Sequence, residues 1–357
     1  MHIPDGYLSP QTCAAAFVVA VPTWAVAANR VTRVVKTRNV PTLAVFAALS
    51  FLVMMFNIPI PDGTTAHAVG AVIIAIALGP WAAVIAVSVA LLFQALLFGD
   101  GGVLAFGANA LNLAILMPFI GYGVYRLIAG RSPLTSTRRI AAAAIAGYTG
   151  INAAALATAV EMGIQPDLFH TASGAPLYSP YGLSQTIPAM ALAHLTIAGA
   201  AEAILTGGVF AYLARTDPAR LAATHRDIPA TAGDAPAPRA RRLTPARMTL
   251  GFVALMVLLT PLGLLAPGGA FGEDAPHDLN LRELGLSAIP AGLAKYNGFW
   301  SHTLLADYGF SDGQHAGLAY LLSAIIGIAV VAAVIFAIST LIERVARHRE
   351  VGKPETA

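Results

Sequence analysis

Nine runs of apolar residues, separated by short polar segments, divide the chain into units the length of a membrane-crossing helix. About 20 apolar residues in helical conformation span the hydrocarbon core of a bilayer. The runs predict helices over residues 11–29, 41–57, 64–79, 80–98, 103–128, 139–163, 184–214, 247–266 and 317–342. The pattern therefore predicts an all-α integral membrane protein.

The basic residues give this arrangement an orientation. Of the 21 Lys and Arg residues, 19 follow the first, fifth, seventh or ninth run, and nine helices place all four of these segments on one side of the membrane. Only Arg282 and Lys295 fall on the other side. Positive charge accumulates in cytoplasmic segments, so we expect the N-terminus outside and the C-terminus in the cytoplasm.

A change of composition divides the chain into two modules. Residues 216–246 are rich in Ala, Pro and Arg and have no apolar periodicity, which predicts a flexible cytoplasmic linker. Residues 1–215 then form a seven-helix core, and residues 247–357 form a two-helix module with an external loop at 267–316.

Overall composition agrees with a protein embedded in lipid. Hydrophobic residues make up 57% of the chain and charged residues 11%, with a mean hydropathy of +0.70, whereas soluble domains carry about 25% charged residues. The net charge of +3 comes from Arg in the inter-helix segments, so we expect no nucleic-acid partner. No Lys follows a phosphate-binding glycine loop and no nucleophile–base set is visible, so we expect no enzyme activity.

The first residues carry the candidate chemistry. The opening Met1-His2-Ile3-Pro4-Asp5-Gly6 lacks the basic segment and long apolar run of a secretory signal, so we expect the encoded N-terminus to be retained. Its α-amine, the His2 amide and the His2 Nδ1 atom can close a five-membered and then a six-membered chelate ring on one metal ion. Planar nitrogen coordination favours Ni²⁺ or Cu²⁺. A turn at residues 4–6 can fold the terminus back, and His67, at the outer start of the third predicted helix, can supply a fourth nitrogen.

Three stretches carry a family resemblance: MHIPDGYLSPQT at the start, HAVGAVIIAIALGPWAAV from His67, and LLFQALLFGDGGVLAFGANALN at 91–112. Over residues 1–214 the chain resembles the CbiM/NikM family, the substrate-binding S components of energy-coupling-factor transporters for cobalt and nickel. The resemblance implies that Met1, His2 and His67 hold the metal through four nitrogens, and the MHIPDG opening is the form typical of nickel members. It also implies a prokaryotic inner-membrane location, with a transmembrane coupling (T) subunit and cytoplasmic ABC ATPases as partners.

The C-terminal module resembles the small two-helix partner subunit of these transporters, a NikN/PDGLE-like module, fused here to the core. Asp307-Tyr308-Gly309 and Ser311-Asp312-Gly313 stand in place of the usual proline-aspartate-glycine stretch, which leaves the role of this loop open.

Polar residues inside the predicted helices have two interpretations. Gln94, Asn109 and Asn112 can link helices through hydrogen bonds, or they can orient the imidazole ligands from a second layer. Glu161, His194 and Glu202 are ionisable groups of the kind that often marks a function in a membrane. The sequence assigns no partner to His194 or Glu202.

Two alternative functions remain open. The same fold could select Co²⁺ for cobalamin synthesis. The chain could instead be a self-sufficient secondary transporter, which requires internal repeats or paired charges at mid-membrane. We find no convincing repeat.

Overall fold

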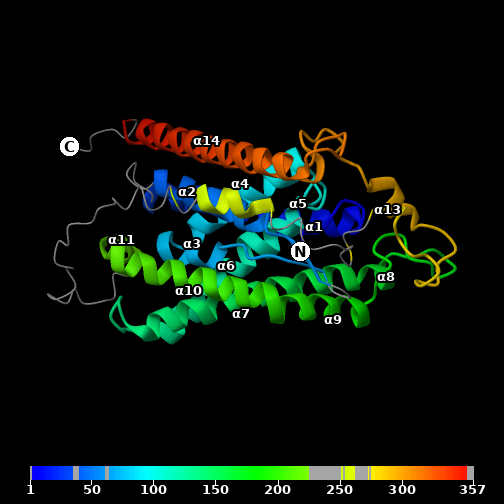
Figure 1. Ribbon diagram of the computed structural model, residues 1–357, viewed down its shortest axis with the longest axis horizontal. Coiled ribbons are helices and arrows are strands. Elements are labelled where there is room, and N and C mark those ends of the chain that lie inside the picture. Colours follow the sequence, from blue (N-terminus) through cyan, green and yellow to red (C-terminus); the bar gives the residue numbers. More distant parts are fainter. Residues whose placement is uncertain are drawn as a thin grey trace.

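The computed structural model is a bundle of helices lying side by side along its longest axis (Figure 1). It describes residues 2–34, 40–60, 64–224, 251, 254–261, 272 and 275–351. The elements are α1 (Pro10–Val34), α2 (Val40–Met54), β1 (Ile58–Pro59), β2 (Thr65–Ala66), α3 (Ala71–Leu78), α4 (Pro80–Phe93), the π-helix η2 (Gln94–Phe98), α5 (Phe106–Asn109), the π-helix η3 (Ala110–Leu116), α6 (Met117–Ala129), α7 (Thr137–Gly163), α8 (Gln165–Leu168), α9 (Leu183–Ala193), the π-helix η4 (His194–Ala198), α10 (Gly199–Thr216), α11 (Pro218–Thr224), α13 (Ala291–Tyr296), the 3₁₀ turn η6 (Ala306–Tyr308) and α14 (Ala316–Val351).

Six helices in the described part of the chain are long and apolar enough to cross a membrane: Pro10–Val31, Pro80–Phe98, Phe106–Ala129, Thr137–Leu168, Leu183–Thr216 and Ala316–Leu341. The apolar helix Val40–Met54 is shorter, at 15 residues. The predicted all-α membrane fold is therefore confirmed. The count of nine stays a prediction, because most of segment 247–266 lies outside the described residues.

The predicted start of the third helix, at residue 64, was wrong, because α3 begins at Ala71. Residues 64–70 are not helical, because β2 pairs antiparallel with β1 in the register Ile58↔Ala66 and Pro59↔Thr65. Gly70 then has a φ of +74° at the N-cap of α3, a conformation that glycine adopts without steric strain. His67 therefore lies in an extended segment before the helix.

The predicted linker begins with regular structure. Residues 218–224 form α11, and the Leu221 side chain is buried against the core. Residues 225–250, which hold most of the predicted linker, lie outside the described residues.

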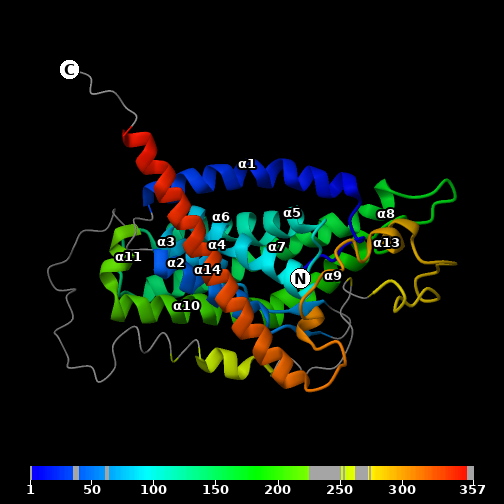
Figure 2. The ribbon, with the colours of Figure 1, turned by 90° about the horizontal axis from the view of Figure 1, so that it is seen from above.

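Helix α3 lies at the centre of the core, and each of its residues is buried. In the C-terminal module, α14 crosses over α2 at an inclined angle (Figure 2). At this crossing Gly327 lies under the Phe51 ring, where an added Cβ would come 2.0 Å from Phe51 Cζ. The missing side chain lets the two helices approach closely.

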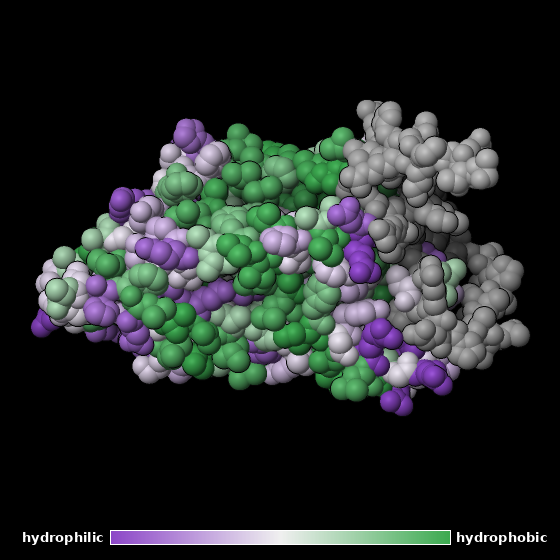
Figure 3. All heavy atoms as spheres, turned by 180° about the vertical axis from the view of Figure 1, so that it is seen from behind, coloured by the Kyte–Doolittle hydropathy of each residue, from purple (hydrophilic) through white to green (hydrophobic). Residues whose placement is uncertain are grey.

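The surface agrees with a position in lipid. Apolar side chains cover most of the middle of the face in Figure 3, and hydrophilic residues gather toward its ends. Large apolar side chains point outward from α1, α6 and α10, among them Val18, Leu127 and Ile204 at 72%, 81% and 75% exposure. Segments 164–182 and 275–315 lie at one end of the bundle, opposite α11 (Figure 1).

Candidate metal-binding site

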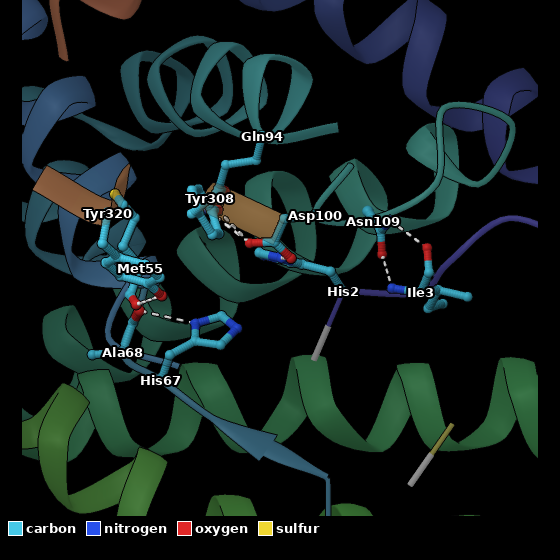
Figure 4. Close-up of polar contacts among 10 residues, drawn as sticks. All are labelled: His2, Ile3, Met55, His67, Ala68, Gln94, Asp100, Asn109, Tyr308 and Tyr320. Atoms are coloured by element: carbon cyan, nitrogen blue, oxygen red, sulfur yellow. Dashed lines mark hydrogen bonds and ion pairs between the residues drawn. The ribbon is translucent and has the colours of Figure 1, made fainter. Parts of the chain in front are cut away.

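The fold brings together two histidines that are far apart in the sequence. The ring centroids of His2 and His67 are 4.9 Å apart, and their planes are inclined by 49°. Both side chains are buried, with 5% and 2% exposure (Figure 4). Met1, the other predicted ligand, lies outside the described residues.

Both rings have one engaged nitrogen and one buried nitrogen without a partner. His67 Nδ1–H donates to the Ala68 carbonyl at 3.1 Å, and His2 Nδ1–H donates to Asp100 Oδ1 at 2.5 Å. Within the described chain, neither Nε2 atom has a hydrogen-bond partner. A buried nitrogen without a partner is costly, whereas metal-bound histidines typically donate their second ring N–H to a carboxylate or carbonyl.

Burial lowers the pKa of His67 well below its ordinary value, and the electrostatic interaction with His2 lowers it further. The ring is therefore neutral at pH 7, the state that a metal ligand requires.

Asp100 is a residue of this site that sequence reasoning missed. Its carboxylate accepts from His2 Nδ1, from the Tyr308 hydroxyl at 2.5 Å and from Gln94 Nε2 at 3.4 Å. Burial by itself raises the pKa of Asp100, but His2 and the Tyr308 hydroxyl hold that pKa below its ordinary value. Asp100 is thus a carboxylate that orients the His2 ring. The sequence analysis included Asp100 only as part of the stretch 91–112 that carries the family resemblance and assigned it no role.

Tyr308 reaches this site from the C-terminal module. Its ring stacks on Phe98 with centroids 4.9 Å apart, and its hydroxyl accepts from Gln94 Nε2 at 3.0 Å. The backbone of Tyr308 has a φ of +61°, which is unusual for a bulky residue and is often found at functional positions. The loop whose role the sequence left open therefore forms one wall of the site.

The start of the chain is fixed by side chains from distant helices. The Asn109 amide donates to the Ile3 carbonyl at 3.0 Å and accepts from the Ile3 N–H at 2.8 Å. Further along, Gln165 Oε1 accepts from the Ser9 N–H at 3.0 Å. Asn109 thus fixes the backbone of Ile3, the residue that follows His2.

Asp5 completes this attachment. Its carboxylate accepts from the backbone N–H groups of residues 103, 104 and 105 at 3.1, 2.8 and 3.0 Å. Burial raises the pKa of the Asp5 carboxyl, and the three N–H donors oppose this rise. A Cβ at Gly102 would come 2.1 Å from Asp5 Oδ1, so this turn can approach the N-terminal segment only as glycine.

Replacing Asp5 by Ala leaves these three N–H groups without their acceptor. A buried unsatisfied donor costs about 1–3 kcal/mol, so we expect a clear drop in the thermal unfolding temperature of the detergent-solubilised protein. The control is Asp278→Ala, which removes a carboxylate whose side chain is 62% exposed and is expected to leave the temperature unchanged. Equal unfolding temperatures for Asp5→Ala and wild type would contradict this role.

Asn112 and His194 make their contacts away from the two histidines. Asn112 Nδ2 donates to Glu161 Oε2 at 2.7 Å and to Thr158 Oγ1 at 3.1 Å, so it links η3 to α7. His194 Nδ1–H donates to the Met190 carbonyl at 2.9 Å within its own helix. Of the three amides for which the sequence left a second layer open, Gln94 contacts Asp100, Asn109 contacts the Ile3 backbone, and Asn112 links two helices.

Few metal-ligating side chains gather at this site. Among the described residues, no group of three or more His, Cys, Asp or Glu side chains is placed to hold a metal ion. The imidazoles of His2 and His67 are thus two candidate nitrogen ligands that the fold brings together.

The chain is similar to known metal-transport proteins. The family model described as "Cobalt uptake substrate-specific transmembrane region" matches residues 2–220. The chain is 49% identical over 346 residues to the "Fused nickel transport protein NikMN" of Rhodobacter capsulatus, covering 93% of this chain and 95% of that protein. It is 46% identical over 333 residues to the "Probable fused nickel transport protein LarMN" of Lactiplantibacillus plantarum, with coverages of 91% and 93%. These alignments extend beyond residue 220 into the C-terminal module.

A solved structure is similar to the core. The "Crystal Structure of an Truncated Transition metal Transporter" is 57% identical, with a TM-score of 0.57, and the match covers 60% of this chain and 98% of that one.

Proposed function

The chain belongs to the family of cobalt-uptake substrate-specific transmembrane regions, and from this premise we propose that it captures Ni²⁺ for uptake across the prokaryotic inner membrane. The observation that carries the proposal is the pair of buried imidazoles, His2 and His67, whose ring centroids lie 4.9 Å apart. His67 in addition keeps its Nε2 atom without a partner among the described residues, while its Nδ1–H donates to a carbonyl oxygen, as in metal-bound histidines.

The proposed ligands are the Met1 α-amine, the His2 amide, His2 Nδ1 and His67 Nε2, arranged in one plane. In the structure His2 Nδ1 faces Asp100. Binding through Nδ1 therefore requires a half-turn of the ring about its Cβ–Cγ bond, which turns Nδ1 away from the carboxylate and exchanges its position with that of Cδ2.

Nickel is favoured over cobalt by the chemistry of the amide. Taking the His2 amide as a ligand requires loss of its proton, and Ni²⁺ gains more than Co²⁺ from the resulting square-planar nitrogen set. Relatives named as nickel transport proteins cover more than nine-tenths of this chain, in support of this choice. The alternatives are Co²⁺ as the substrate and a transporter that acts alone.

The partners proposed here are a transmembrane coupling subunit and cytoplasmic ABC ATPases. The sequence holds no Gly-x-x-x-x-Gly-Lys-Ser/Thr motif, so the chain itself lacks the loop that binds nucleotide phosphates in such ATPases. Copurification of the chain with these subunits and metal-dependent ATP hydrolysis by the assembly test this part of the proposal.

Metal competition tests the site. We expect the purified protein to rank Ni²⁺ above Co²⁺ and Zn²⁺, with Cu²⁺ at least as tight, because planar nitrogen coordination suits d⁸ and d⁹ ions. Bound Ni²⁺ should be diamagnetic, with a yellow to orange d–d band. Tighter binding of Co²⁺, or paramagnetic six-coordinate Ni²⁺, would show that the ligands are arranged differently.

Acidification should weaken Ni²⁺ binding between about pH 8 and about pH 6, because the α-amine, with an ordinary pKa of ~7.7–8.0, must lose its proton to bind. Burial lowers the pKa of His67 well below its ordinary value, so His67 adds little to this dependence and His67→Ala should keep it. Titration calorimetry at several pH values, in buffers of different ionisation enthalpy, measures the released protons. Affinity that is constant from pH 8 to pH 6 would contradict an amine ligand.

A further inference from the structure

The segment that carries His67 has no regular structure of its own to hold it. It lies between the two-residue strand β2 and the first turn of α3. The position of His67 Nε2 therefore depends on what fixes residues 68–70.

Glu202, from the distant helix α10, supplies that support. Its Oε2 atom accepts from the Val69 N–H at 2.8 Å and from the Gly70 N–H at 2.9 Å. Its Oε1 atom accepts from the Thr206 hydroxyl at 3.0 Å, one turn further along the same helix. Glu202 is fully buried, so these donors replace the water that a carboxylate otherwise requires.

The other side of the turn is held as well. The Ser50 hydroxyl donates to the Val69 carbonyl at 2.7 Å, so both polar groups of the Val69 backbone are bonded to side chains. Directly before it, the Ala68 carbonyl accepts from His67 Nδ1–H (Figure 4). A continuous path of hydrogen bonds and covalent bonds thus joins Glu202 to the His67 ring.

We propose that Glu202 is a positioning residue for the metal site, which holds the 68–70 turn so that His67 Nε2 points toward His2. This inference rests on the proposed function. If Glu202 stabilised only the packing of α10 on α3, it would not need hydrogen bonds to the residues that follow His67. The Glu202 carboxylate accepts two such bonds.

A double-mutant cycle separates positioning from general stability. Loss of an outer partner of a metal ligand lowers metal affinity about 10–100-fold, so we expect Glu202→Ala to weaken Ni²⁺ binding by this factor and to weaken the planar Ni²⁺ band. In the His67→Ala background the same change should alter affinity by less than about 2-fold, because its effect passes through His67. Additive losses in the double variant overturn the proposal.

Conservative and matched variants sharpen the test. In Glu202→Gln the amide oxygen can accept both backbone N–H groups and the NH₂ group can donate to Thr206, so affinity should return to within a few-fold of wild type. Glu161→Ala removes another buried glutamate, whose carboxylate accepts from Asn112, and is expected to lower thermal stability while leaving Ni²⁺ affinity unchanged. Glu202→Gln binding as weakly as Glu202→Ala would overturn the proposal.

If Glu202→Ala does not fold, Thr206→Val takes its place in the cycle, with a smaller loss that again vanishes with His67→Ala. If the wild type binds Ni²⁺, and His67→Ala lowers this affinity while Glu202→Ala does not, the role of Glu202 is overturned but the proposed function is not. A wild-type protein that fails to bind Ni²⁺ would overturn the proposed function as well.

Discussion

A Gly-Ser-Gly-Ser extension in front of Met1 is expected to abolish tight Ni²⁺ binding. The extension converts the α-amine of Met1 into a peptide amide and so removes the ligand that starts the chelate. It also adds bulk where the segment that follows is buried, since Ile3, Tyr7 and Leu8 are each at most 1% exposed. Because loss of a mere outer partner costs about 10–100-fold in affinity, loss of a ligand should exceed about 100-fold. Calorimetry on the purified protein measures it.

The length of the extension matters. A single added residue would make His2 the third residue, where an amine, two amides and an imidazole can form a planar nitrogen set without His67. Four residues avoid this. Proteolytic removal of the extension back to Met1 should restore binding, and the same extension after Ala357 should have no effect. Full affinity in the uncleaved protein would exclude the terminal amine as a ligand.

Replacement of His2 by Ala is expected to have the second largest effect. It removes the imidazole that closes the six-membered ring and that Asp100 orients at 2.5 Å, so Ni²⁺ affinity should again fall by more than about 100-fold. His67→Ala should weaken binding less, because a three-nitrogen chelate remains that water or chloride can complete. Ni²⁺ titrations of the two variants, with thermal unfolding as a control for folding, give the order.

The order of the two losses is the discriminating result. If His67→Ala binds Ni²⁺ like wild type, the fourth ligand has been misassigned. If His2→Ala loses no more affinity than His67→Ala, the chelate through the His2 amide and imidazole is not the centre of the site.

The sequence alone indicated His2 and His67, because their place along the chain was enough to suggest them as metal ligands. His2 could be named because a histidine beside a terminal amine has chelating geometry wherever the terminus folds, and His67 because the apolar pattern placed it on the same side of the membrane. The structure brings the two rings within 4.9 Å.

The sequence could not indicate what depends on tertiary packing. Residues 64–70 continue an apolar run and were predicted as helix, but pairing of β2 with β1 and the positive φ of Gly70 give an extended segment instead. The roles of Asp100 and Glu202 were missed for a related reason. Their partners lie 98 and 132–133 residues away, and no local periodicity records such distances.

The contact between Tyr308 and Asp100 has a consequence for how the site is assembled. Tyr308 and His2 belong to the same chain, so the tyrosine reaches the carboxylate in an intramolecular step. Tethered partners meet at an effective concentration set by the tether, and dilution of the protein does not change it. Each copy therefore carries one core and one tyrosine in fixed ratio, whatever the level of expression. Every translated copy of the chain therefore supplies its own Tyr308 beside His2.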